Sequence, residues 1–322
     1  MYASEGYTHA QDGFSKTKNI DFLKRAASQG KLYLDVVALP GFNEMKKWLN
    51  NKQYSFGQYE NGLKLQGMKI TQDGSPQAKT AKVSHPYLTG GLHGEADWHG
   101  TNTQPKDDFI KQIKIAVDAG LQIFIHANGD ATIDQAIEAI EKAGIRATDD
   151  RRTVIIHSQF QRPDHLEKYK SLGISPSYFT NHVYFWGDVH SKNIGLEKAS
   201  FISPVKAAVD NGLIYSNHTD FNVTPLDPFF VMFSAMKRET RSGKILGKDQ
   251  RVDAYTALQG LTTGPAWQIF EEHRKGKLKV GLLADLIILD KNPITTSTDE
   301  IKNIQVLQTI KQGKVIYQQQ TK

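Results

Sequence analysis

Short apolar runs with strand-like composition alternate with longer stretches of helical periodicity along most of the chain. The strand-like runs cover residues 6–10, 32–39, 65–70, 121–126, 153–157, 174–179 and 212–216. The patterns between them predict helices over 19–29, 107–119, 131–143, 163–172 and 204–211. Glycines at 120, 144, 173 and 212 stand where the last four of these helices should stop. Strand and helix repeating in this order indicate a parallel sheet with crossover helices.

The number and order of these units favour a barrel. A closed (β/α)8 barrel needs eight strands and about 250 residues, and seven strand candidates precede a change of pattern, so the missing unit lies at the front. Helices are expected next over 253–259 and 266–272, followed by β-rich stretches over 278–290 and 306–317 with a hairpin turn at Lys311-Gln-Gly-Lys314. We therefore predict an α/β fold, a TIM-type (β/α)8 barrel lacking strand 1 over residues 1–274. Residues 275–322 would form the C-terminal part of a small β-sandwich.

Composition narrows the kinds of partner and of metal site. The 322 residues are 39% hydrophobic and 23% charged, which is typical of a globular chain. No cysteine is present, so a metal would have to bind His, Asp, Glu or a modified Lys. The net charge is +6, but the lysines are scattered and form no basic run, so we expect no nucleic-acid partner.

Targeting signals are also missing from the sequence. No apolar stretch is long enough to span a bilayer, so we expect no membrane association. The first residues have neither a basic region nor an apolar core of a signal peptide. We expect a cytoplasmic protein, with export left open if the natural N-terminus lies upstream of Met1. The sequence leaves open whether the chain forms a homodimer.

Two histidines and one aspartate follow strand-like runs at equivalent points. His126 and His157 end successive apolar strands, and Asp220 follows a later one. The carboxyl ends of barrel strands form one mouth, where imidazoles can bind metal and a carboxylate can bind metal or take a proton from water. The competing interpretation is that both histidines merely cap strands and that Asp220 is a turn residue or helix N-cap.

Lys69, His182 and His218 are weaker candidates. Lys69 ends the strand before Thr71-Gln-Asp-Gly, where a lysine is usually only a solvated charge. His182 and His190 flank an aromatic-rich segment after the strand candidate at 174–179, which we expect to be a loop that lines a pocket or packs in the core. His218 either orients a bound carbonyl or faces the helix layer.

An ordered set of motifs resembles a known family. The motifs are Lys69-Ile-Thr-Gln-Asp-Gly-Ser, His126-Ala-Asn-Gly-Asp, Ile156-His-Ser-Gln, Ser216-Asn-His-Thr-Asp and Gly281-Leu-Leu-Ala-Asp-Leu. Together, from Tyr2 to Tyr317, they are similar to the amidohydrolase superfamily, in particular to amidohydrolase family 3 and its branch of N-substituted formamide deformylases.

The resemblance implies a role for each candidate. Lys69 would be carboxylated by carbon dioxide and bridge two metals, His126 and His157 would bind one metal, and Asp220 would bind the other and act as general base. His182 and His218 would contact substrate. The expected cofactor is a divalent metal, with zinc the expected ion and one or two ions bound.

The chain departs from the family in one respect. Family members begin with a strand ending His-x-His, which supplies two metal ligands, and no His-x-His occurs here. The pair His93 and His99 and the pair His182 and His190 have the wrong spacing. We therefore expect a fragment of a longer protein, in preference to a natural truncation.

The function implied by this resemblance is hydrolysis of a C–N bond in a small amide or formamide-like substrate by metal-activated water. One alternative is a catalytically inactive barrel fragment that needs a complementing chain. A further alternative is an esterase or lactonase with the same site, because that chemistry differs only in the leaving atom.

Overall fold

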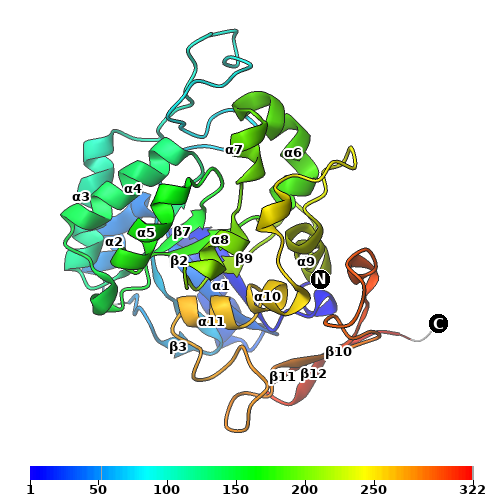
Figure 1. Ribbon diagram of the computed structural model, residues 1–322. Helices are drawn as coiled ribbons and strands as arrows, with labels where there is room; N and C mark the ends of the chain where they lie inside the picture. Colours follow the sequence, from blue (N-terminus) through cyan, green and yellow to red (C-terminus); the bar gives the residue numbers. More distant parts are fainter. Residues whose placement is uncertain (52, 321–322) are drawn as a thin grey trace.

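The computed structural model describes residues 1–51 and 53–320 as an α/β protein (Figure 1). The strands are β1 (His9–Ser15), β2 (Asp35–Pro40), β3 (Tyr59–Glu60), β4 (Leu63–Leu65), β5 (Gly67–Thr71), β6 (Gln122–Ala127), β7 (Val154–His157), β8 (Ser175–Tyr178), β9 (Ser216–Asn217), β10 (Leu286–Leu289), β11 (Val306–Lys311) and β12 (Lys314–Gln318).

The α-helices are α1 (Thr17–Ser28), α2 (Met45–Asn50), α3 (Lys106–Asp118), α4 (Asp130–Lys142), α5 (Pro163–Leu172), α6 (Asn181–Ile194), α7 (Leu196–Ser200), α8 (Val205–Asp210), α9 (Pro228–Lys237), α10 (Ala254–Gln259) and α11 (Thr263–Gln268). Short 3-10 turns lie at Ala3–Glu5, Phe42–Glu44, Ala147–Asp149, Lys248–Gln250 and Ile301–Asn303.

Parallel strands form the centre of the molecule. One sheet has the order β5-β6-β7-β8-β9, and a second has the order β1-β2-β4-β3, in which only β3 runs antiparallel to its neighbour. A single parallel bridge between Gly41 and Lys69 connects the two. The predicted parallel sheet with crossover helices is confirmed.

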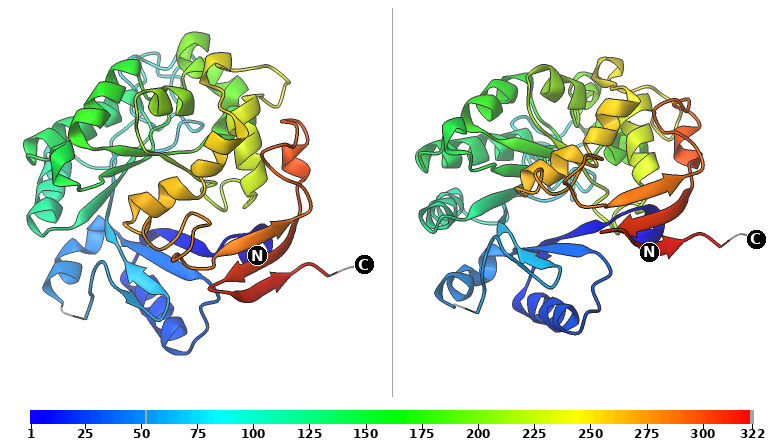
Figure 2. Two further views of the ribbon diagram at one scale, coloured as in Figure 1. Left: turned by 60° about the horizontal axis from the view of Figure 1, so that its bottom comes forward. Right: turned by 90° about the horizontal axis from the view of Figure 1, so that it is seen from below.

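The middle strands are apolar on both faces because both faces are buried, one under the helices and the other against strands of the second sheet. On β6, Ile123 and Ile125 belong to the core under the surrounding helices, whereas Phe124 points to the opposite face. There it meets Val37 and Leu39 from β2, a strand that is not its neighbour in the sheet. The side chains of β2 and β6 can meet in this way only if the sheets curve toward one another, as Figure 2 shows.

The ladders do not close into a ring. Within residues 1–51 and 53–320, β1 pairs only with β2 and β9 pairs only with β8, so each leaves one edge without a ladder. The eight-stranded closed barrel is therefore not observed. Seven parallel strands in the expected order, β1, β2 and β5 to β9, do correspond to the seven strand candidates of the sequence.

Helix ends were predicted well from glycine, and other boundaries less well. Gly120, Gly144, Gly173 and Gly212 all adopt left-handed φ values, between 65° and 75°, directly after helices. The helix expected over 266–272 instead lies at Thr263–Gln268. The strand expected over 65–70 is two strands, because Gln66 separates β4 from β5.

The aromatic-rich segment after β8, which was expected to be a loop, is the helix α6. This expectation was wrong because Gly187 and the many aromatic residues hide a helical pattern. Gly187 is in fact tightly packed, since a Cβ there would lie 2.8 Å from the Thr240 side chain. The absence of a side chain allows α6 to approach the 238–246 loop.

The C-terminal strands form a three-stranded antiparallel sheet in the order β10-β11-β12, shown in orange to red in Figure 2. The predicted hairpin is confirmed, with Lys311 opposite Lys314. This sheet is tied to the rest of the chain by buried charges: Lys275 and Lys311 contact Asp35 Oδ2 of β2 at 2.5 and 3.0 Å. Among the helices of the described residues, none is both long and apolar enough to cross a bilayer.

Candidate active site

His126 lies at the carboxyl end of β6 on the inner face of the sheet. It is two residues beyond Phe124, and strand alternation therefore turns both side chains to the same side. Its Nδ1 lies 3.2 Å from Asp73 Oδ1, and its Nε2 lies 3.3 Å from the Asn128 side-chain amide. Asp73 is itself fixed by backbone N–H donors from Asn128 and Gly129 at 3.0 and 2.8 Å.

His157 reaches the same place by an unusual backbone conformation. Simple alternation after Ile156 would turn it toward the helix layer, because Ile156 faces inward. Instead His157 has a φ of 75° and Ser158 a φ of 44°, a region that non-glycine residues rarely adopt. The His157 ring consequently lies 4.6 Å from the His126 ring, centre to centre. Strain of this kind persists where the surroundings enforce it, and it is frequent in functional sites.

A third imidazole completes the group. His218, just past β9, places its Nε2 3.1 Å from Nδ1 of His157, and its ring stacks on Phe179 at 5.0 Å. Burial lowers the pKa of His157 well below its usual value, and lowers that of His218 to about 4. Both rings are therefore neutral at pH 7, which is the form in which imidazole binds metal.

Lys69 is buried beside these rings, and it differs from the other buried lysines. Its exposed fraction is 5%, like the 3% of Lys64 and the 6% of Lys275. Lys64 pairs with Glu271 at 2.8 Å and Lys275 with Asp35 at 2.5 Å. Lys69 has no carboxylate within 4.0 Å in the described part of the chain. Burial lowers its pKa to about 7, and the field of Asp220 only partly opposes that shift.

Asp220 lies on an exposed turn after β9, two residues beyond His218. Its φ of 48° is left-handed, so the backbone at this position is strained as it is at His157. Its charge acts on both Lys69 and His218. The structure thus brings Lys69, His126, His157, His218 and Asp220 to the carboxyl ends of the parallel strands.

His182 and His190 are both on α6, and both are buried. His182 packs on Phe179 at 4.6 Å, and Phe179 in turn stacks on His218. His190 contacts Phe160 of the segment after β7 edge-on at 5.4 Å. Burial lowers the pKa of His190 to about 3 and, together with the neighbouring imidazoles, that of His182 well below its usual value.

The depressed pKa of His190 predicts acid-sensitive folding. Between pH 6.5 and about 3 the unfolded chain binds a proton at this residue and the folded chain does not, so stability falls as pH falls through this window. The slope should be about 1.4 kcal/mol per pH unit for this residue. Urea unfolding at pH 7, 6 and 5 should show a shallower loss for His190→Phe than for the parent chain. The exposed His85→Phe should leave the slope unchanged, and an equal slope in all three would contradict the assignment.

The profile of the amidohydrolase family matches residues 1–317. The chain belongs to the amidohydrolase family.

Its relatives are longer than the chain itself. An N-substituted formamide deformylase from Arthrobacter pascens is 25% identical over 324 residues, covering 98% of this chain and 58% of the relative. The putative amidohydrolase YtcJ of Bacillus subtilis (strain 168) is 22% identical over 302 residues, covering 92% of this chain and 54% of the relative. This amidohydrolase therefore spans a little over half the length of these relatives.

Solved structures agree with the family. An uncharacterized metal-dependent hydrolase from Pyrococcus horikoshii OT3 superposes with a TM-score of 0.76 at 26% identity, over 90% of this chain and 57% of that one. A similar hydrolase from Pyrococcus furiosus gives a TM-score of 0.75 at 26% identity, over 89% and 56% of the two chains.

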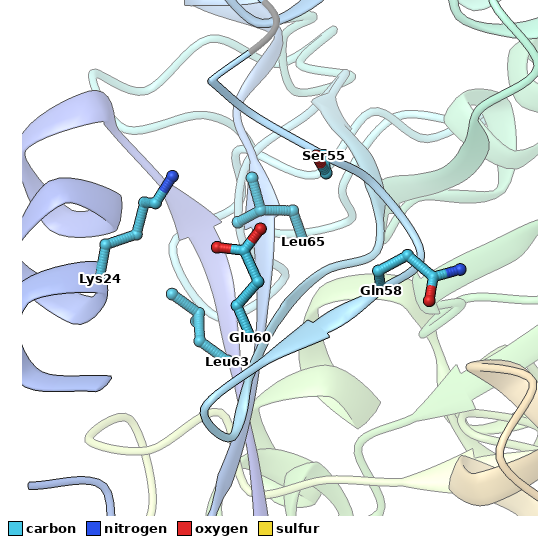
Figure 3. Close-up of a pocket in the computed structure, with 6 residues that line it drawn as sticks. All are labelled: Lys24, Ser55, Gln58, Glu60, Leu63 and Leu65. Carbon is cyan, nitrogen blue, oxygen red and sulfur yellow. The ribbon is translucent and has the colours of Figure 1, made fainter. Parts of the chain in front are cut away.

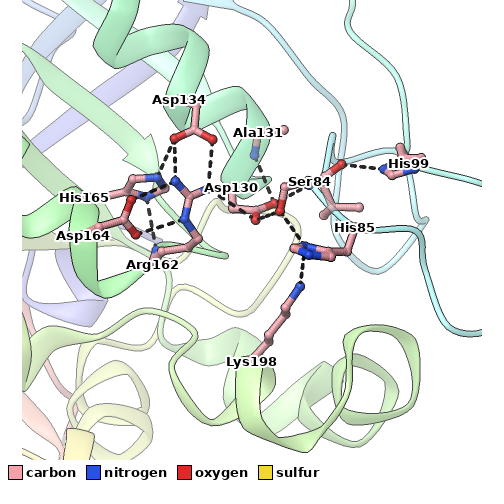
Figure 4. A network of polar contacts seen from close by, with 11 residues as sticks. Ser84, His85, His99, Asp130, Ala131, Asp134, Arg162, Asp164, His165 and Lys198 are labelled. Carbon is pink, nitrogen blue, oxygen red and sulfur yellow. Dashed lines mark hydrogen bonds and ion pairs between the residues drawn. The ribbon is translucent and has the colours of Figure 1, made fainter.

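A second group of metal-type ligands in this amidohydrolase was not anticipated from the sequence. Asp134 of α4 and the pair Asp164 and His165 of α5 place ligand atoms within 4.8 Å of one another (Figure 4). Arg162 forms ion pairs with both carboxylates of this group, and its guanidinium lies 2.7 Å from Asp134 and 2.9 Å from Asp164. Three acidic or imidazole side chains around an arginine form an ion-pair network that joins two helices, and this network requires no metal.

A shallow hollow lies elsewhere on the molecule. Figure 3 shows it between α1 and the β3–β4 hairpin, lined by Lys24, Ser55, Gln58, Glu60, Leu63 and Leu65. None of these residues belongs to the group at the strand ends. The hollow is therefore separate from the candidate active site.

Proposed function

We propose that this amidohydrolase hydrolyses the C–N bond of a small amide or formamide-like substrate with water activated by a divalent metal. The observation that carries the proposal is Lys69, a buried amine without a carboxylate partner in the described chain, beside the neutral imidazoles of His157 and His218. A permanent ammonium there would be a costly isolated charge. A neutral amine can instead react with carbon dioxide.

The lysine reaction yields the anionic ligand that the site lacks. The Lys69 nitrogen forms a bond to the carbon of carbon dioxide and loses a proton, which leaves a carbamate with two oxygen donors. The carbamate on Lys69, with His126 and His157, would then hold one metal, and zinc suits this mixture of nitrogen and oxygen donors. Asp73 beside His126 and His218 beside His157 would fix the orientation of the two ligating rings.

Asp220 is the proposed general base. A bound divalent metal would supply a water of lowered pKa and polarise the substrate carbonyl. Asp220 takes the proton of that water and returns it to the nitrogen of the leaving amine, so that acyl and amine products form with no net proton change in the site. His182 and His218 would contact the substrate around Phe179.

A second metal position would be incomplete within this chain. It would have Asp220 and one oxygen of the carbamate, and the sequence contains no His-x-His to add two imidazoles. Two oxygen donors are too few for tight binding, so we propose that the chain retains at most one metal. We also propose that residues 1–274 and 275–322 are the two folding units, and that the first carries the site.

Turnover by the chain and its Asp220→Asn variant tests this function. With zinc and bicarbonate supplied, release of amine from a panel of N-substituted formamides and acyl amides should be detectable, and Asp220→Asn should reduce it by about 100-fold or more. Asp188→Asn is the control, because this half-buried aspartate caps the 240–242 turn and lies outside the site. Hydrolysis only of esters and lactones would favour the esterase reading. Absence of any turnover in the metal-loaded chain would favour the inactive fragment.

A further inference from the structure

His182 and His190 of α6 share a hydrogen bond that has no role in the reaction proposed above. Nδ1 of His182 lies 3.0 Å from Nε2 of His190. The two rings are nearly parallel, with an interplanar angle of 15° and centres 5.3 Å apart. One of these two nitrogens must carry a proton and the other must accept it, so the bond couples the tautomer of one ring to that of the other.

The surroundings of His190 decide which tautomer is favoured. The residue is fully buried, with Phe160 against its ring. Its second nitrogen, Nδ1, is buried and has no hydrogen-bond partner among the described residues. A proton on that nitrogen would be a buried N–H without an acceptor, and such donors are rarer in proteins than unused acceptors. His190 is therefore better accommodated with its proton on Nε2, donated to His182.

The consequence for His182 follows directly. Since its Nδ1 accepts the proton of His190 Nε2, the neutral ring of His182 must carry its own proton on Nε2. Within the described chain, no side chain or backbone group is bonded to that Nε2. The ring of His182 meets Phe179 edge-on at 4.6 Å, Phe179 also stacks on His218, and His218 is bonded to His157. Phe179 thus contacts both His182 and the imidazole cluster.

We propose that His190 is a positioning residue that holds His182 as a neutral Nε2–H donor for the carbonyl oxygen of the substrate. This role rests on the proposed function, because the oxygen to be stabilised is that of the amide undergoing attack. The polarity matters chemically: a developing oxyanion needs a donor, and the opposite tautomer of His182 would present a lone pair that repels it. His182 then stabilises the oxygen and does not bind metal or act as a base.

Nitrogen chemical shifts of histidine test the tautomer without any need for turnover. The full 322-residue chain is labelled with 15N-histidine, and the signals of His182 are assigned by their loss in His182→Gln. In the parent chain, Nδ1 of His182 should have the shift of an unprotonated nitrogen and Nε2 that of a protonated one. His190→Gln keeps an N–H donor and should preserve this pattern. His190→Leu removes the donor and should move His182 to the other tautomer or to a mixture.

Steady-state kinetics on the formamide substrate give the second readout. His190→Leu should lower kcat by about 10- to 100-fold, the usual size of such supporting contacts, and His190→Gln should restore most of it. A proton on Nδ1 of His182 in the parent chain, or an unchanged tautomer in His190→Leu, would overturn the proposal. If His182 has the expected tautomers but the chain hydrolyses no amide, the proposed function is wrong. The role of His182 as a donor to the substrate oxygen is then refuted as well. A His190→Leu chain with a shifted tautomer and unchanged kcat would refute the positioning role alone.

Discussion

Replacing His157 with alanine should leave the chain unable to retain metal. His157 and His126 are the two imidazoles in contact at the ends of β6 and β7, and a three-donor site that loses one donor falls below the usual makeup of a catalytic zinc site. We expect about one metal per parent chain after dialysis and less than about a tenth of that in His157→Ala, because each structural donor contributes several kcal/mol to binding. Asp220→Asn should retain most of the metal, because we assign Asp220 to the proposed second position, which is incomplete.

Elemental analysis of dialysed protein measures this directly. His93→Ala is the matched control, since His93 is exposed on the loop between β5 and α3 and should lose nothing. Two metals per parent chain, or full retention by His157→Ala, would contradict the assignment. So would an equal loss in His93→Ala.

Lys69→Met should have opposite effects on stability and on metal. The substitution replaces a buried amine, which has no carboxylate partner within the described part of the chain, by an apolar chain of similar length, so the metal-free chain should gain on the order of 1–3 kcal/mol of unfolding free energy. The same change removes the nitrogen that would form the carbamate, and metal retention should be lost. A substitution that only disturbed packing would not be expected both to stabilise the protein and to abolish metal retention.

Lys64→Met provides the matched control for stability. Lys64 is as buried as Lys69, but its ammonium pairs with Glu271 at 2.8 Å and donates to the Ile269 carbonyl oxygen at 2.9 Å. Removing the ammonium leaves the buried carboxylate of Glu271 without its lysine partner. The free energy of unfolding should therefore fall by about 3 kcal/mol. Urea midpoints of the metal-free proteins, measured without carbon dioxide, compare the two. A similar destabilisation in both variants would show that Lys69 is an ordinary structural lysine.

Much of the local structure follows from the sequence because it depends on near neighbours. Helix ends at Gly120, Gly144, Gly173 and Gly212 are decided by which residue tolerates a left-handed backbone. The apolar runs that became β6 and β7 need no long-range information, since strands covered on both faces are apolar along most of their length. Their alternation with helices was sufficient to predict a parallel sheet.

The candidate site was only partly visible in this way. His126 follows from simple alternation along β6. Lys69 looked like a solvated charge from the pattern, and only the resemblance to a family raised it to a candidate. Its distinguishing feature is a buried amine with no carboxylate within 4.0 Å among residues 1–51 and 53–320, and that depends on which other side chains the fold brings close.

Tertiary structure alone decided the remaining features, for a common reason. The left-handed backbone that turns the His157 ring inward, the helix formed by the aromatic-rich α6 segment, and the hydrogen bond between His182 and His190 all depend on contacts between residues distant in the chain or far along a helix. Such contacts contribute more free energy than the local conformational preferences of one or two residues, and the contacts therefore decide the structure. The sequence determined the kinds of side chain available at the strand ends and their order along the chain. Packing determined which imidazole nitrogens are hydrogen-bonded and which buried amine lies without a carboxylate within 4.0 Å among the described residues.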